Sequence, residues 1–130
     1  MSGQGTRIVA AARGWIGTPY RHQAACRGAG CDCLGLVRGL WREIKGAEPE
    51  QPPAYSMDLL AKDLAQEAVG DVILFRMREG SVAKHLGVVA GVGARASFIH
   101  AYSGHGVVET ALSAPWRRRI VARFQFPEEG

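Results

Sequence analysis

The sequence predicts an α+β domain in which helices come first and an antiparallel sheet follows. In the first half, apolar residues recur at intervals of three and four, the period of a helix packed on a core. From Gly70 onward apolar and polar residues alternate, as they do in strands. The chain has 130 residues, of which 47% are hydrophobic, so we expect residues 1–130 to form a single domain.

The first expected helix covers residues 6–16, with Thr6 as its N-cap. Residues 17–19, Gly-Thr-Pro, would end it, and its apolar face comprises Ile8, Val9, Ala12, Trp15 and Ile16. Residues 20–30 are rich in Gly, Arg and Ala, a composition typical of a loop. This loop would bring Tyr20 to the start of the second helix.

The second expected helix carries a cysteine in its first turn. Its apolar stripe comprises Cys33, Leu36, Val37, Leu40, Trp41 and Ile44. Asp32 is well placed as the N-cap, and Gly46 would end the helix. Free N–H groups and the helix dipole at such a terminus favour a thiolate. Cys33 is therefore a candidate nucleophile, although a cysteine in this position is more often a small core residue.

The second half is expected to contain a short helix and then five strands. After the proline-rich segment 47–53, the helix would cover residues 57–68 with Ser56 as its cap. A turn is expected over residues 78–81, and strands over residues 72–76, 84–90, 97–102, 107–110 and 120–126. Alternation in the last strand places Arg123 on its wetter face.

Two histidines fall on neighbouring expected strands. If the hairpin turns between Val92 and Gly93, residues whose numbers sum to 185 lie opposite each other, and His85 and His100 meet this condition. Opposed residues share a face with Cβ atoms about 5 Å apart, so one imidazole could orient the other. A slip of one residue would place them on opposite faces. His105 is expected in an exposed turn.

These side chains together suggest nucleophilic catalysis by a thiol. A thiol that attacks an acyl carbon needs a base, and the base needs a third group that fixes its tautomer. Cys33, His85 and His100 can fill the roles of nucleophile, base and orienting residue. The backbone N–H of Cys33 and the phenol of Tyr20 could bind the oxyanion.

Five short segments in this order carry a resemblance to a known enzyme family. They are Gly17-Thr18-Pro19-Tyr20-Arg21, Asp32-Cys33-Leu34-Gly35-Leu36-Val37, Gly70-Asp71-Val72-Ile73-Leu74-Phe75, His85-Leu86-Gly87-Val88-Val89 and Phe98-Ile99-His100-Ala101. Over about Thr6 to Phe126 the chain resembles the NlpC-type cell-wall cysteine peptidases.

This resemblance implies a compact papain-like α+β fold. The implied activity is hydrolysis in the stem peptide of bacterial peptidoglycan, often between D-γ-glutamyl and a diamino acid. By resemblance Cys33 is the nucleophile, His85 the base and His100 the polar third member. Tyr20 and Asp32 correspond to residues that line the substrate groove.

The segment after the cysteine points to a subgroup. Leu34 stands where many family members have serine, which removes a polar contact to substrate. The run from Cys33 to Gly39, with the Trp-Arg-Glu of residues 41–43, resembles short members encoded with tail genes of phages and gene transfer agents. Such a protein would dock on other tail or baseplate proteins as a virion component. Residues 1–13 show no signal peptide, so we expect synthesis in the cytoplasm and carriage to the wall in a particle tail.

The net charge of +4 raises the question of an anionic partner. The densest basic run is Arg117-Arg118-Arg119, beside Trp116. It could bind nucleic acid or an anionic wall polymer, but a solvated strand edge is the more common outcome. Aromatic residues do not interleave with basic ones, so no specific nucleic acid is expected, and no membrane span is expected either.

Three alternatives remain open. A zinc site could use His22, Cys26, Cys31 and Cys33, but paired C-x-x-C units are absent and both strand histidines stay unexplained, so no metal or other cofactor is expected. Cys26 and Cys31 are then bystanders, kept reduced like the third thiol. The chain could also be a structural tail subunit with little turnover. A Cys–His amidase or acyltransferase acting on another bond is the third alternative.

Overall fold

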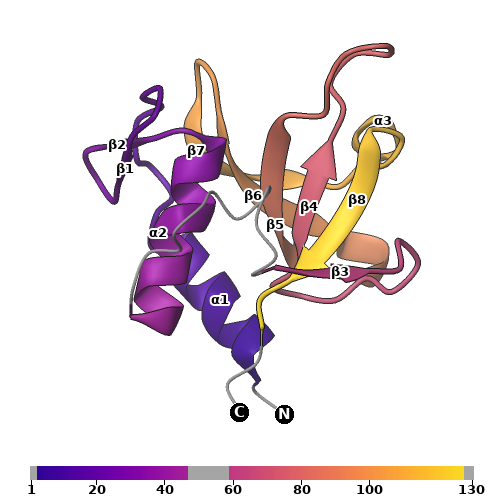
Figure 1. The fold of residues 1–130 in the computed structure, drawn as a ribbon, viewed down its shortest axis with the longest axis horizontal. Coiled ribbons are helices and arrows are strands. Elements are labelled where there is room, and N and C mark those ends of the chain that lie inside the picture. Colours follow the sequence, from indigo (N-terminus) through magenta and orange to yellow (C-terminus); the bar gives the residue numbers. More distant parts are fainter. Residues whose placement is uncertain (1–2, 47–58, 128–130) are drawn as a thin grey trace.

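The computed structural model describes residues 3–46 and 59–127, in which helices pack against an antiparallel sheet (Figure 1). The predicted α+β class is confirmed. None of the described helices has the length and apolarity needed to cross a bilayer. In chain order the elements are α1 (Gln4–Arg13), β1 (Ala25–Cys26), β2 (Gly30–Cys31), α2 (Cys33–Lys45), β3 (Leu60–Lys62), β4 (Val72–Phe75), β5 (His85–Gly91), the 3-10 turn η2 (Gly93–Arg95), β6 (Ser97–Tyr102), β7 (Gly106–Ala111), α3 (Ala114–Arg117) and β8 (Ile120–Gln125).

The main sheet has six antiparallel strands in the order β3-β8-β4-β5-β6-β7. All five strands predicted from alternation are present, with ends that agree within two residues. The loop expected over residues 20–30 contains a small hairpin, because Ala25 pairs with Cys31 and Cys26 with Gly30. This hairpin lies beside the N-terminal end of α2 (Figure 1).

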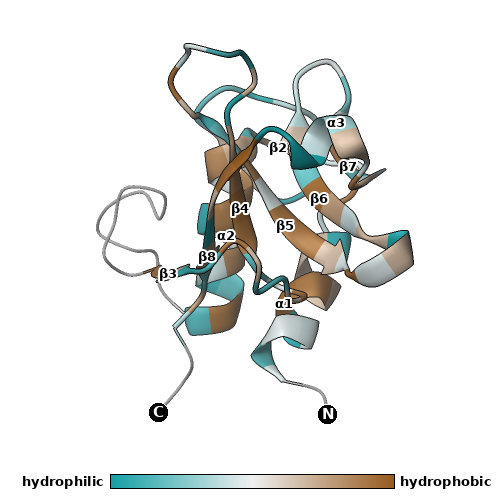
Figure 2. Ribbon diagram, turned by 90° about the vertical axis from the view of Figure 1, so that its right-hand side faces the viewer, coloured by the Kyte–Doolittle hydropathy of each residue, from teal (hydrophilic) through white to brown (hydrophobic). Residues whose placement is uncertain are grey.

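Helices α1 and α2 cover one face of the sheet. The apolar stripe of α2 is buried as predicted, with Leu36, Val37 and Leu40 fully inaccessible to solvent. Trp15 lies against Gly39 so closely that a Cβ there would stand 2.2 Å from the indole, so only glycine allows this packing. Figure 2 shows hydrophobic residues concentrated on β4 and β5, the strands at the centre of the sheet.

The other face of the sheet is buried too, beneath α3. A second apolar cluster there contains Ile73, Phe75, Val89, Ala96, Phe98 and Leu112, with Trp116 packed against it. Val88 and Ile99 point to the helix-covered face, whereas Val89 and Phe98, their immediate neighbours in the chain, point to this second cluster. The four strands β4 to β7 therefore separate two cores.

The first helix differs from its predicted bounds. It begins at Gln4 after an N-cap at Gly3 that has no side-chain hydrogen bond, so Thr6 is not the cap. It ends at Arg13, because the chain must turn to reach β7, where the Gly17 N–H donates to the Val107 carbonyl at 3.0 Å.

The helix predicted over residues 57–68 is wrong for the described part of this range, residues 59–68, which contains no helix. Ser56 and its neighbours in 47–58 lie outside the described residues, but Leu60–Lys62 is a strand that pairs with β8 at the edge of the sheet. The predicted wet position of Arg123 is also wrong. Its side chain is 2% exposed and pairs with Asp71 at 3.5 Å, and Asp71 also accepts from Lys62 at 2.9 Å. Ion pairing therefore overrides the polarity pattern.

Candidate active site

Asp32 fixes the junction between the loop and the start of α2. One carboxylate oxygen accepts from the Gly35 N–H at 2.8 Å, which confirms the predicted N-cap. The other accepts from the Gln23 N–H at 2.7 Å. Gln23 has a φ of +59°, the left-handed region that non-glycine residues seldom adopt, so Asp32 also holds a strained loop in place. Both carboxylate oxygens thus bind backbone beside the candidate nucleophile.

Tyr20 reaches the same helix end through backbone pairing. It forms a parallel bridge with Cys31, in which the Arg21 N–H donates to the Cys31 carbonyl at 3.0 Å. Burial raises the pKa of the Tyr20 phenol, and the nearby Cys33, Asp32 and Cys31 raise it further. The hydroxyl therefore stays protonated at neutral pH and remains a hydrogen-bond donor close to Cys33.

The Cys33 thiol is partly buried between α2 and the start of β5. Its Sγ lies 3.5 Å from the Lys84 carbonyl, to which it donates. Burial raises the pKa of the Cys33 thiol; the Leu86 N–H lowers it, Asp32 raises it, and the N–H groups of Leu34 and Cys33 lower it. The thiol touches the backbone on both sides of His85, because Lys84 and Leu86 flank that residue. Burial outweighs the helix terminus, so a base has to remove the proton.

His85 and His100 form a hydrogen-bonded pair. His85 Nε2 lies 2.7 Å from His100 Nδ1, and the two ring centroids are 5.0 Å apart. The predicted register is wrong by two residues, because the observed pairs Val88–Ile99 and Val89–Phe98 place His100 opposite Gly87. The turn through η2 and an adjoining bulge lengthens the connection. A shift of two residues leaves a side chain on the same face of the sheet, so the prediction that His85 and His100 share a face is confirmed. The two histidines are diagonal neighbours rather than directly opposed residues.

Thr110 extends the pair to three groups. Its Oγ1 lies 2.8 Å from His100 Nε2, and His100 is fully buried. If Thr110 Oγ1 accepts from the Nε2–H of His100, then Nδ1 of His100 carries no proton and accepts from the Nε2–H of His85. The Nδ1 of His85 is then unprotonated, and its lone pair can take the proton of Cys33. The sequence carries no signal for Thr110, because only the pairing of β6 with β7 brings it here.

Burial keeps both imidazoles neutral. It lowers the pKa of His85 to about 4. It also lowers the pKa of His100 to about 3, with smaller contributions from His85 and His105. A neutral imidazole at pH 7 is the form that can accept a proton from a thiol.

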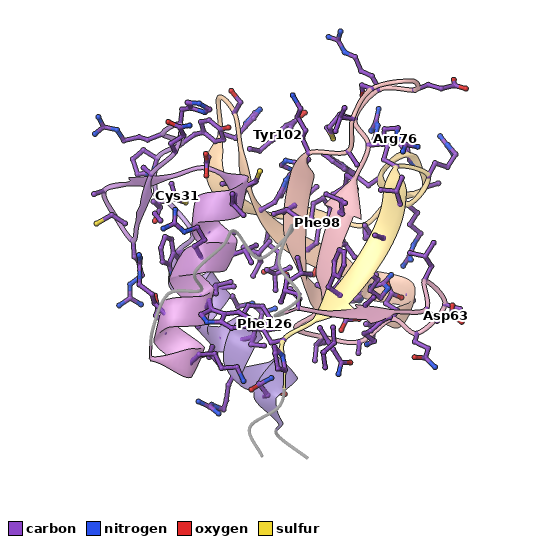
Figure 3. All side chains as sticks on the ribbon, in the orientation of Figure 1. Cys31, Asp63, Arg76, Phe98, Tyr102 and Phe126 are labelled. Carbon is purple, nitrogen blue, oxygen red and sulfur yellow. The ribbon has the colours of Figure 1, made fainter. Side chains whose placement is uncertain are left out.

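Aromatic side chains surround the two rings. The Trp116 centroid lies 6.0 Å from that of His85 and 5.3 Å from that of His100. Tyr102 lies 5.8 Å from His85, and Phe98 lies 4.3 Å from His100. Figure 3 shows Phe98 in the interior and Tyr102 at the end of the sheet, both on β6. This packing fixes the ring orientations and leaves His100 without exposed surface. The solvated edge expected for residues 117–119 is confirmed for Arg117 and Arg118, which are exposed, whereas Arg119 is partly buried.

A hollow of about 410 Å³ opens on the Tyr20 side of the site. It is lined by residues 17–20 and by the turn at residues 104–106. His105 in this turn is exposed, as predicted, but it also stacks on Tyr102 with centroids 5.3 Å apart and planes at 10°. The hollow is large enough to admit part of a peptide.

The residues of the zinc alternative do not converge. Cys31 is buried, and burial together with the nearby Asp32 and Cys33 raises its pKa to about 12. Cys26 and His22 are exposed. Within the described residues, no group of three His, Cys, Asp or Glu side chains is placed to hold a metal ion. The structure instead places the Cys33 thiol against the backbone on both sides of His85, whose ring is hydrogen-bonded to His100.

Solved structures share this fold at low sequence identity. The NlpC/P60 domain of the peptidoglycan hydrolase SagA has a TM-score of 0.74 at 22% identity, covering 94% of this chain and 98% of that one. NlpC2 from Trichomonas vaginalis has a TM-score of 0.77 at 20% identity, and the match covers 97% of this chain and 48% of NlpC2. The peptidoglycan hydrolase RipB from Mycobacterium tuberculosis has a TM-score of 0.68 at 17% identity, and the match covers 98% of this chain and 66% of RipB. The chain thus spans nearly all of the SagA domain but about half of NlpC2.

Sequence comparison identifies the family. Curated protein sequences give no match. The sequence model of the NlpC/P60 family matches residues 17–124, a range that contains Tyr20, Cys33, His85 and His100. Because this match covers most of the chain and the solved structures share its fold, the protein belongs to the NlpC/P60 family.

Proposed function

We propose that the protein is a cysteine peptidase that hydrolyses the stem peptides of bacterial peptidoglycan, at the bond between D-γ-glutamyl and a diamino acid. The observation that carries the proposal is the His85–His100 hydrogen bond of 2.7 Å beside a thiol that contacts both backbone neighbours of His85. Membership of the NlpC/P60 family supports it, as do the names of SagA and RipB, both peptidoglycan hydrolases.

In the first half of the reaction, the sulfur of Cys33 attacks the acyl carbon. His85 Nδ1 takes the thiol proton, while its Nε2–H donates to His100 Nδ1 and stabilises the imidazolium that forms. The negative charge on the substrate oxygen is met by the Cys33 N–H and the Tyr20 hydroxyl. One such donor contributes about 10²- to 10³-fold to kcat.

The second half releases both products. The His85 imidazolium gives its proton to the leaving amine, the C–N bond breaks, and the acyl group remains on Cys33 as a thioester. His85 then takes a proton from water, whose oxygen attacks the thioester. The carboxylate product leaves and the proton returns to Cys33.

The test is incubation of purified protein with peptidoglycan, followed by mass analysis of the soluble fragments. We expect fragments cut within the stem peptide from the wild-type protein and none from Cys33→Ala. Cys26→Ala is the matched control, since it removes an exposed thiol outside the site. Fragments released equally by Cys33→Ala would contradict the proposed nucleophile.

An amidase is the second candidate, because the same thiol and imidazole can attack another amide of peptidoglycan. The same mass analysis separates the two activities. An amidase frees intact stem peptides from muramic acid, whereas the proposed endopeptidase leaves part of each stem peptide on the glycan.

We also propose that the protein acts from the tail of a phage-like particle, docked on other tail or baseplate proteins. Support comes from the resemblance of the Cys33–Gly39 segment to tail-encoded family members. Particles that carry Cys33→Ala should assemble normally but deliver DNA poorly. Normal delivery by such particles would instead favour a structural subunit with little turnover.

A further inference from the structure

Three arginines line a hollow that the proposed reaction does not use. It measures about 380 Å³ and is lined by Arg76, Met77, Glu79, Arg118, Arg119 and Val121. Arg76 follows β4, whereas Arg118 and Arg119 connect α3 to β8. The Arg76 N–H donates to the Arg119 carbonyl at 2.8 Å, so the two sides of the hollow are joined through backbone.

The positive charge of this hollow is largely uncompensated. Among the described residues, acidic groups form ion pairs with Arg13, Arg27, Arg117 and Arg123, but with none of Arg76, Arg118 and Arg119. Glu79 is the one acidic side chain in the lining. Three arginines therefore line the hollow with one acidic residue, and the Arg76 Nε–H donates to the neutral Ser81 carbonyl at 3.0 Å, which leaves a net positive charge that favours a bound anionic group.

The hollow lies next to the proposed base. Phe75, the last residue of β4, pairs with His85, so Arg76 comes directly after the strand end beside that histidine. The Arg119 guanidinium lies 5.6 Å from the Trp116 centroid, which is 6.0 Å from the His85 centroid. One aromatic ring thus separates this guanidinium from the base. Figure 3 shows Arg76 at the same end of the sheet as Tyr102.

Two hollows therefore flank the strand that carries the proposed base. The hollow that Tyr20 lines adjoins the β6–β7 turn, the arginine hollow adjoins β4 and β8, and β5 with His85 runs between them. An extended peptide advances about 3.3 to 3.6 Å per residue. The Arg119 guanidinium lies at most about 12 Å from the His85 ring, so a peptide with its scissile bond beside His85 would reach it within about three or four residues.

We propose that Arg76, Arg118 and Arg119 form a subsite for a free carboxylate of the substrate peptide, which extends the proposed function and rests on it. Guanidinium groups bind carboxylates through paired hydrogen bonds of matching planar geometry. A γ-linked glutamate keeps its α-carboxylate free, and a diamino acid linked through one amine keeps carboxylates of its own. The subsite would select peptides in which the carboxylate at that position is not amidated.

The experiment measures binding by calorimetry with the Cys33→Ala protein, which removes turnover. The probes are a synthetic stem peptide with the γ-glutamyl–diamino acid linkage and matched peptides in which one carboxylate at a time is a carboxamide. We expect one carboxamide peptide to bind about tenfold more weakly. Adding Arg118→Gln or Arg119→Gln to this protein should weaken its binding of the parent peptide by about the same factor and leave its affinity for that carboxamide peptide unchanged. The matched control is Arg7→Gln, an exposed arginine on α1.

Each result decides the proposal. If the arginine variants weaken the binding of the parent and the carboxamide peptides equally, the proposal is overturned, because Arg119 would then act only by supporting Trp116. Arg118 is exposed, so Arg118→Gln tests the carboxylate contact without disturbing that packing. Oligothymidylate serves as a further probe: if Arg118→Gln or Arg119→Gln abolishes its binding but leaves the affinities for both peptides unchanged, the hollow is a general polyanion site and the proposal is overturned. Failure of Cys33→Ala to bind any peptide would also overturn it. Selective binding by a protein whose wild type cleaves nothing would support the subsite while refuting the proposed function.

Discussion

At Cys33, burial and the helix terminus act on the thiol in opposite directions. The backbone N–H groups lower its pKa, but burial raises it by more, so the side chain is a protonated thiol in the absence of a base. His85 is neutral because burial holds its pKa at about 4. Proton transfer between these two side chains is therefore part of the attack itself.

Substitution of the two histidines should separate their roles. His85→Ala removes the base and should lower kcat/KM by about 10² to 10⁴. His100→Asn should retain part of the activity, because an amide oxygen can still accept from His85 Nε2–H and orient the ring. Initial rates on defined stem peptides, with circular dichroism as a check of folding, measure both. Equal losses would mean that the roles of base and orienting residue are misassigned.

Among the elements, α2 presents the nucleophile, and its start depends on one carboxylate. Asp32 caps the helix and also holds the left-handed Gln23. The cap is a local feature, which is why the sequence predicts it. The second contact depends on how the loop folds back, and Gly35 permits this because a Cβ there would stand 1.8 Å from the Ala24 carbonyl.

Removal of the cap should therefore affect both stability and activity. Asp32→Ala should lower the free energy of unfolding by about 0.5 to 2 kcal/mol, the usual range for a lost N-cap. It should also reduce kcat, since the loop that carries Tyr20 loses the contact between Gln23 and Asp32, one of its ties to the start of α2. Urea denaturation gives the stability change, and Asp32→Asn, which keeps an acceptor oxygen, should recover part of it. A destabilisation equal in both variants would argue against capping as the cause.

The strands β6 and β7 and the short helix α3 assemble the rest of the site. Alternation predicts the strands, but His100 meets Thr110 only because β6 and β7 pair in one register. The four residues of α3 are too few for a periodic signal, and Trp116 reaches the histidines only because α3 packs on the second apolar cluster, on the face of the sheet that carries His85 and His100. Thr110 and Trp116 were therefore beyond sequence reasoning, whereas Cys33, His85 and His100 were within it.

For the whole molecule, the buried histidines link stability to pH. The pKa values of His85 and His100 are about 4 and about 3 in the folded protein, against an ordinary value of 6.5. Between these values the unfolded chain binds more protons than the folded one, so stability falls as pH falls from about 6.5 toward 3. At 1.36 kcal/mol per unit of pKa, His85 alone accounts for about 3 kcal/mol.

Denaturation at two pH values tests this linkage. The free energy of unfolding should be lower at pH 4 than at pH 7, and His85→Gln should reduce that difference. His22→Gln is the control, because His22 is exposed and should leave the difference unchanged. A pH dependence that is identical in all three proteins would contradict the assignment to buried histidines.

Local sequence patterns were enough to predict the α+β class, the capped helix with its cysteine, the core strands and the shared face of the two histidines. Each of these follows from short-range periodicity, capping chemistry or strand parity, which a local pattern contains. The folded chain was needed to reveal the register of the histidine pair, the strand at Leu60–Lys62, the burial of Arg123 and the arginine hollow beside Trp116. These depend on contacts between segments far apart in the chain, where packing and ion pairing outweigh local preference.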